Sequence, residues 1–300
     1  MKAIELKDVI KSFNGHVAVN NLTLSVPKGS VYGFIGPNGS GKTTTLRMIM
    51  NILYPDSGEI RIFDEPISRP GIDRIGYMPE ERGLYKRMKV RDLLQFFGEL
   101  KNGKNVRAQV DQWLERLDLN DWADKKIETL SKGMSQKVQF IATVVGQPEL
   151  VLLDEPFTGL DPVNTDVIKD AILEFQAQGA TVIFSTHDMS MAEKMCDFIF
   201  MIFKGNKVLD GTLSSIQDTY GSDTIRVRAE KGACILQDIA GVEKVNDFGQ
   251  MQEVRMRAGS DPHRILSEIM LRTRVSSFDI VKPSLHDIFV RIAGPEAGGT

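Results

Sequence analysis

A glycine-rich segment carries the clearest chemistry in the sequence. Residues 36–43 read Gly-Pro-Asn-Gly-Ser-Gly-Lys-Thr and match the phosphate-binding pattern G-x-x-x-x-G-K-[ST] in full. Its glycines let the backbone turn tightly and point N–H groups at a polyphosphate, and the positive end of the following helix adds attraction. Lys42 reaches the β- and γ-phosphates, and the Thr43 hydroxyl is a ligand for Mg²⁺. The segment therefore predicts a nucleoside triphosphate site formed by Gly36, Asn38, Gly39, Ser40, Gly41, Lys42, Thr43 and Thr44.

A second informative segment is the apolar run Leu-Val-Leu-Leu at 150–153, which two acidic residues follow directly. At the carboxyl end of a strand in a parallel sheet, Asp154 would face a Mg²⁺ ion beside the phosphate loop. Glu155 would hold and polarise an attacking water, and such a general base contributes roughly 10²–10⁴-fold in rate. The alternative for both acids is a strand end capped by solvated carboxylates.

Two further polar segments could take part in the same chemistry. His187 follows the apolar run 181–185 and could contact a γ-phosphate, although a lone histidine is more often structural. Ser131 and Gly133 precede a predicted helix over 137–145, whose N-terminus attracts anions, although plain helix capping also explains the pair. The four histidines and two cysteines show no spacing typical of zinc ligands.

Composition narrows the class of protein. The chain has 300 residues, of which 42% are hydrophobic and 26% charged, enough for one large domain or two ordinary ones. A net charge of −3 gives no sign of nucleic-acid binding. Cys196 and Cys234 form no disulfide framework and favour a reducing cytoplasm. The charged start is no signal peptide, and no apolar run approaches the about 20 residues of a membrane-spanning helix.

The order of the predicted elements indicates an α/β fold. Alternating residues at 4–9 and 22–26 predict half-buried strands, and apolar residues recur at helical spacing from about 88 to 145. The residues 31–35 before the phosphate loop, and the apolar runs at 150–153 and 181–185, are typical of strands buried in a parallel sheet.

A second, smaller α+β domain is expected beyond a boundary near 214–223. Its predicted elements are strands at 224–228, 254–257 and 277–281 and helices at 232–240 and 263–271. The expected division is a nucleotide-binding domain over 1–218, an α+β domain over 224–293 and a disordered tail over 294–300.

Taken in order, these motifs resemble the ATP-binding subunit of an ABC transporter. The loop at 36–43 matches its Walker A motif, and 150–155 matches its Walker B motif with the catalytic glutamate. Residues 131–134, Ser-Lys-Gly-Met, resemble the signature sequence, and 158–161 resemble the D-loop. His187 takes the place of the switch histidine.

The resemblance implies both a fold and an assembly. The fold is a P-loop NTPase of ABC type, with a β-rich subdomain, a parallel-sheet core and a helical subdomain at about 85–145. Phe13 would stack on adenine. In the family two such domains pack head to tail, so that Ser131 and Gly133 complete the partner's ATP site and Asp161 links the two sites. ATP and Mg²⁺ are the implied cofactors. A second copy or a paired ATP-binding subunit, and a membrane permease subunit that holds the chain at the inner face of the cell membrane, are the implied partners, with no nucleic acid expected.

Two positions depart from the family pattern. Lys132 adds a long cation where the signature usually has glycine. Glu80 stands where the family usually has the glutamine that approaches Mg²⁺ and water; a carboxylate can still ligate Mg²⁺ but adds negative charge near a triphosphate. A basic segment at 82–91 follows, which in the family faces the membrane subunit and is otherwise a solvated charged surface.

The segment at 79–85, Pro-Glu-Glu-Arg-Gly-Leu-Tyr, is similar to that of a bacterial exporter branch of ABC-2 type, related to sodium or drug efflux. That branch often carries a small C-terminal domain ending much like residues 283–290, for which dimer support or regulation is the favoured role. The resemblance implies ATP hydrolysis that powers export of an ion, drug or other small substrate. The alternatives are a soluble ABC ATPase acting on ribosomes or DNA, and a nucleotide-binding regulator.

Overall fold

Two structural units make up the chain. The computed structural model describes residues 1–67, 72–81, 83–102, 105–221, 224–230, 235–257 and 259–294. Its internal contacts divide the chain into Met1–Thr212 and Leu213–Thr300. The helix α8 (Leu213–Tyr220) belongs to the second unit, where Gln217 donates a hydrogen bond to the carbonyl of Pro283 over 2.9 Å. None of the described helices is both long and apolar enough to cross a membrane.

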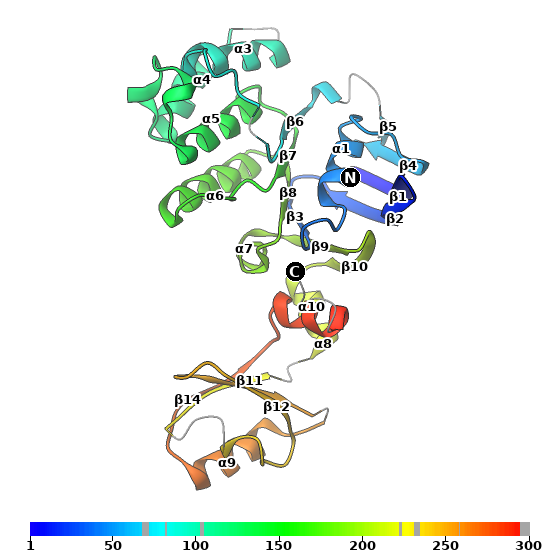
Figure 1. The fold of residues 1–300 in the computed structure, drawn as a ribbon, viewed down its shortest axis with the longest axis vertical. Helices are drawn as coiled ribbons and strands as arrows, with labels where there is room; N and C mark the ends of the chain where they lie inside the picture. The colour runs from blue at the N-terminus through cyan, green and yellow to red at the C-terminus, as the bar shows by residue number, and fades with distance from the viewer. Residues whose placement is uncertain are drawn as a thin grey trace. The chain divides into compact units, whose positions relative to one another are not determined.

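A six-stranded sheet forms the centre of the first unit (Figure 1). Five of its strands are parallel, and only the edge strand β10 runs antiparallel to its neighbour. From one edge to the other the strands are β10 (Asn206–Gly211), β9 (Phe198–Phe203), β3 (Val31–Ile35), β8 (Thr181–Thr186), β7 (Leu150–Asp154) and β6 (Ile75–Met78). The α/β fold class with a parallel core is confirmed.

Both faces of this sheet are buried, which explains the continuous apolar runs of its strands. Successive side chains of a strand point to opposite faces. Leu152 packs into a core with the β-rich subdomain, while its neighbours Val151 and Leu153 pack into a second core with the helices. All five residues of β7 are buried, so its end is held firmly in place.

The β-rich subdomain is a four-stranded antiparallel sheet of order β2-β1-β4-β5. Its strands are β1 (Lys2–Phe13), β2 (His16–Pro27), β4 (Ser57–Ile62) and β5 (Glu65–Pro66). The helix α1 (Lys42–Ile49), which follows the phosphate loop, buries Leu46 and Met48 in the core shared with this sheet.

The other described helices of the first unit pack on the opposite face of the central sheet. They are α3 (Val90–Asn102), α4 (Arg107–Arg116), α5 (Lys132–Val144), α6 (Pro162–Ala177) and α7 (Met189–Met195), with short 3₁₀ turns at Asn120–Trp122 and Ile127–Thr129. Trp113 of α4 meets Phe140 of α5 edge to face, with ring centroids 5.8 Å apart. The helical character expected for residues 88–145 is confirmed.

The second unit is an antiparallel sheet of order β12-β13-β11-β14 with helices. Besides α8, its described elements are β11 (Thr224–Ala229), β12 (Val242–Asp247), β13 (Gln252–Met256), α9 (Pro262–Arg272), β14 (Val275–Val281) and α10 (Leu285–Ala293). Its core joins Ile225 and Val254 of the sheet to Ile265 and Ile269 of α9.

One expectation for this unit is wrong. A helix was predicted at 232–240, but the described residues 235–240 form turns, and residues 231–234 lie outside the described part. Leu236 and Ile239 nevertheless reach the core, so turns bury the same apolar side chains that suggested a helix. The predicted tail also lies outside the described residues, apart from Gly294, which ends α10.

Candidate functional site

The phosphate loop leaves β3 and is closely packed against its neighbours. The Gly36 N–H donates to the carbonyl of Thr186 over 3.3 Å. A Cβ on Gly36 would overlap the carbonyl of Ile202. Gly41 has φ 109° and lies so close to β2 that a Cβ there would be 2.5 Å from the Ala18 carbonyl oxygen. The backbone therefore takes a path at these two positions that only glycine permits.

Lys42 points back into this loop from the first turn of α1. Its side chain is 6% exposed, and Nζ donates hydrogen bonds to the carbonyls of Gly36 (2.7 Å) and Pro37 (3.2 Å). Nζ also lies 3.6 Å from Glu155 Oε1. Burial lowers the pKa of Lys42, while the charges of Glu155 and Asp154 raise it. An anion that arrives in the loop would find a cation already in place.

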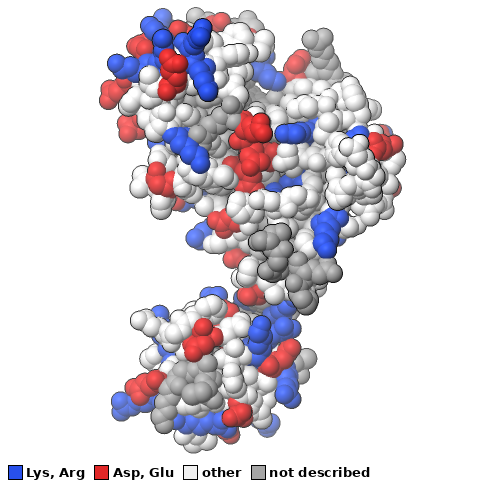
Figure 2. Space-filling view, viewed as in Figure 1, with Lys and Arg blue, Asp and Glu red and all other residues white. Residues whose placement is uncertain are grey.

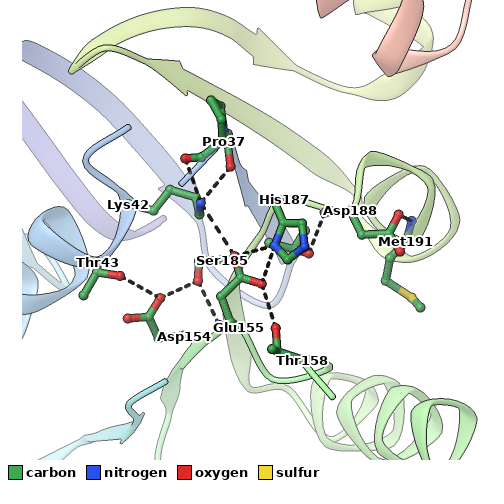
Figure 3. Close-up of polar contacts among 12 residues, drawn as sticks. Pro37, Lys42, Thr43, Asp154, Glu155, Thr158, Ser185, His187, Asp188 and Met191 are labelled. Carbon is green, nitrogen blue, oxygen red and sulfur yellow. Dashed lines mark hydrogen bonds and ion pairs between the residues drawn. The ribbon is translucent and has the colours of Figure 1, made fainter. Parts of the chain in front are cut away.

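Asp154 and Thr43 meet at the end of β7 (Figure 3). Asp154 is fully buried, and its Oδ1 accepts hydrogen bonds from the hydroxyls of Thr43 (3.2 Å) and Ser185 (2.6 Å). Its Oδ2 is also buried and has no hydrogen-bond partner among the described residues. A buried carboxylate oxygen without a partner is costly, and a cation would satisfy it.

Glu155 turns away from β7 in a strained conformation. Its φ of 51° is uncommon for a residue with a side chain, and such strain is found at functional sites. Its N–H donates to Ser185 Oγ over 2.9 Å. The carboxylate accepts from Thr158 Oγ1 (3.2 Å), and both of its oxygens lie 3.1 Å from His187 Nδ1 (Figure 3). The two residues predicted to be catalytic, Glu155 and His187, are therefore in contact.

The signature and D-loop residues make a separate local arrangement at the ends of two helices. Ser131 caps α5, where its Oγ accepts from the Met134 N–H over 3.2 Å. Asp161 caps α6, and the hydrogen bond from the Asn164 N–H is the main cause of its lowered pKa. A Cβ on Gly133 would lie 3.3 Å from the same Asn164 side chain, so the two helix ends adjoin.

The remaining predicted residues are placed as follows. Asn38 and Gly39 are exposed at the tip of the loop, Thr44 is half-buried, and the buried hydroxyl of Ser40 has no hydrogen-bond partner among the described residues. Phe13 ends β1 with its ring 41% exposed and the Lys11 ammonium group 5.5 Å from the ring centre. Part of the Phe13 side chain is therefore accessible to a ligand.

A pocket of about 340 Å³ adjoins this cluster. Glu80, which was predicted as a metal ligand, lines this pocket together with Glu155, and its charge acts to raise the pKa of Lys42. The described residues that line the pocket are Glu80, Glu81, Lys132, Gln136, Glu155 and Thr158.

Two residues of the site were not identified from the sequence. Ser185 donates to the Asp154 carboxylate and accepts from the backbone N–H of Glu155, and Thr158 donates to the Glu155 carboxylate. Ser185 ends an apolar run in which a serine is unusual, and this was the one signal in the sequence. Its contacts depend on the position of β8 between β3 and β7, which brings Ser185 beside Asp154.

We expect Ser185→Ala to destabilise the protein and loosen both acids. The change removes one donor to a buried carboxylate and one acceptor for the Glu155 N–H, and such a loss costs about 1–3 kcal/mol. Unfolding in urea measures this loss as a decrease in the free energy of unfolding. Ser267→Ala on the exposed face of α9 is the matched control, with an expected change near zero. An equal effect of the two substitutions would contradict the structural role of Ser185.

Known proteins are similar to this chain along both of its units. Residues 19–158 match the family model described as ABC transporter, and 211–293 match the C-terminal domain of DrrA1-3-like ATP-binding proteins. A third model, an AAA domain described as putative AbiEii toxin, matches residues 126–191. The uncharacterized ABC transporter ATP-binding protein YhaQ of Bacillus subtilis is 36% identical over 97% of this chain and 98% of its own length. The Nod factor export ATP-binding protein I of Burkholderia lata is 31% identical over 98% of this chain and 97% of its own.

Solved structures of ABC transporter subunits have a fold similar to that of this chain. An ATP-binding subunit of an ABC transporter superposes with a TM-score of 0.68 and 28% identity, over 73% of this chain and 93% of that one. The cbiO1 protein of Clostridium perfringens is part of the ABC transporter complex cbiONQ. It superposes with a TM-score of 0.65 and 28% identity, over 73% of this chain and 92% of that one. The chain therefore belongs to the ATP-binding subunits of ABC transporters, a family that hydrolyses ATP to power transport.

Proposed function

We propose that this chain is the Mg²⁺-dependent ATPase subunit of an exporter and works as one half of a head-to-tail pair. The observation that carries the proposal is the meeting of the Walker A and Walker B residues. Thr43 lies 3.2 Å from Asp154, and Lys42 lies 3.6 Å from Glu155, although more than a hundred residues separate them in the sequence.

The donor set fits MgATP. Thr43 Oγ1 and Asp154 Oδ2, which has no hydrogen-bond partner in the described part of the chain, would hold Mg²⁺, since hydroxyl and carboxylate oxygens are its preferred ligands. The loop N–H groups and Lys42 would hold the phosphates, and Phe13 would stack on the base. When bound, Mg²⁺ neutralises charge on the phosphates that hydrolysis rearranges.

Glu155 is the group placed to accept a proton from water. Thr158 and His187 fix its carboxylate from two sides, which limits the orientations from which it can act. His187 keeps a side chain that is 56% exposed, so it can also reach a terminal phosphate from the solvent side. Lys42 would move from Glu155 to the phosphates as they bind, which leaves the carboxylate available as the base.

The second copy supplies the rest of the site. Ser131 and Gly133 lie at the N-terminus of the 13-residue helix α5, which favours anions, yet their contacts given above are with Met134 and Asn164 rather than with the phosphate loop of the same chain. In a head-to-tail pair these residues would close over the γ-phosphate bound by the partner, and Asp161 would connect the two sites. A paired ATP-binding subunit could take the place of the second copy.

Export is favoured by one group of relatives. Nod factor export ATP-binding proteins match this chain along nearly its whole length, including the second unit. The chain would accordingly bind the cytoplasmic side of a permease at the inner face of the cell membrane, and the permease would carry the substrate pathway.

We expect Glu155→Gln to abolish ATP hydrolysis and to keep ATP binding. The amide has nearly the same shape as the carboxylate but cannot accept the proton, and a general base contributes roughly 10²–10⁴-fold. Phosphate release and equilibrium nucleotide binding measure the two properties. Asp166→Asn, an exposed change on α6, serves as the control and should leave both unchanged. A hydrolysis rate in Glu155→Gln equal to that of the wild type would rule out Glu155 as the base.

Membrane association tests the exporter assignment. We expect the chain, purified by an affinity tag from solubilised membranes of its own cells, to bring a permease subunit with it. Deletion of that permease should release the chain from the membrane fraction. If the chain instead sedimented with ribosomes and never with membranes, a soluble ABC ATPase would be the better assignment.

A further inference from the structure

The two positions at which this chain departs from the family motifs lie around the same pocket. Glu80, in the place of the usual glutamine, and Lys132, in the place of the usual signature glycine, both line the cavity of about 340 Å³ beside Glu155. They are far apart in the sequence, and the fold of the first unit brings them to one pocket. Two unusual charges of opposite sign in one pocket suggest that each balances the other.

Acidic residues outnumber basic ones in the described lining of the pocket. Among the described residues, its lining holds three carboxylates, those of Glu80, Glu81 and Glu155, and one ammonium group, that of Lys132. Figure 2 shows Asp and Glu side chains gathered in the middle of the visible face of the first unit, over β6 and β7. Unbalanced carboxylates here would repel a triphosphate approaching Lys42 and Thr43.

Lys132 lines this pocket and also lies against the D-loop. It is the first residue of α5, where a cation is unfavourable, and no acidic residue stands in the first turn to offset it. Its side chain crosses the D-loop so closely that a Cβ on Gly159 would overlap it. Among the described residues its ammonium group has no hydrogen bond or ion pair, so the carboxylates of the pocket are left to stabilise it through space.

We propose that Lys132 is a positioning residue that offsets the charge of Glu80, Glu81 and Glu155 in its own chain and thereby admits MgATP to the site. The inference rests on the proposed ATPase function. Neighbouring residues then have different roles. Ser131 and Gly133 contact the nucleotide bound by the partner, whereas Lys132 offsets the charge of the pocket in its own chain. A chain with Glu80 requires the lysine, and a chain with glutamine at that position does not.

A double-mutant cycle tests this dependence. At low salt, Lys132→Gln should raise the KM for MgATP about fivefold in the chain with Glu80, since exposed charge pairs contribute up to about 1 kcal/mol. In a Glu80→Gln chain the same substitution should have an effect of less than about twofold. Lys132→Arg, which keeps the charge, should behave as the wild type. Lys126→Gln, a lysine outside the pocket, is the control and should change the KM in neither chain.

Two further measurements separate charge balance from a general structural role. The fivefold effect should disappear in about 1 M salt, where the Debye length falls to about 3 Å. In the nucleotide-free protein, Lys132→Gln should lower the urea midpoint of unfolding, and Glu80→Gln should restore most of that loss.

The outcomes are distinct. Equal effects of Lys132→Gln in both chains, insensitive to salt, would overturn the proposal. If the wild-type protein hydrolysed no ATP, the proposed function would fail, and the unfolding cycle would still decide whether Lys132 and Glu80 interact.

Discussion

A buried ammonium group and two buried carboxylates share one end of the central sheet, and their mutual compensation is the constraint on which the site depends. Lys42, Asp154 and Glu155 are each less than a tenth exposed. Removal of one partner from such a buried set costs about 3–5 kcal/mol, because the remaining charges lose their compensation. The close approach at Gly36, the strained φ of Glu155 and the hydrogen bonds of Ser185 all serve to bring these groups within reach of one another.

The same compensation explains how the site can receive a highly charged ligand. Lys42 is held by two loop carbonyls and by Glu155, which are contacts that phosphate oxygens can replace. Asp154 keeps one buried oxygen without a partner among the described residues, ready for a cation. Binding of MgATP would therefore exchange one set of charge partners for another rather than expose new charge.

Much of this site could be predicted from the sequence, because the phosphate loop and the acids of β7 are contiguous motifs with a defined relation to their strands. Lys42, Thr43, Asp154 and Glu155 are brought together in the structure, although their roles stay predictions. The part played by Ser185 could not be predicted, because it depends on the order β3-β8-β7, which is set by the packing of distant strands. The helix predicted at 232–240 was wrong for a related reason. Leu236 and Ile239 satisfy the spacing of a helix, but they reach the core from turns.

The claim that the site is shared between two copies is tested most directly by sedimentation velocity with and without MgATP. Chains carrying Glu155→Gln should bind ATP without hydrolysing it and sediment as dimers. Addition of Ser131→Arg should leave ATP binding at Lys42 intact and return the protein to monomers, whereas Asn120→Arg, the same charge change elsewhere in the helical subdomain, should leave the dimers unaffected. Normal dimers in the Ser131→Arg chain would contradict the shared site.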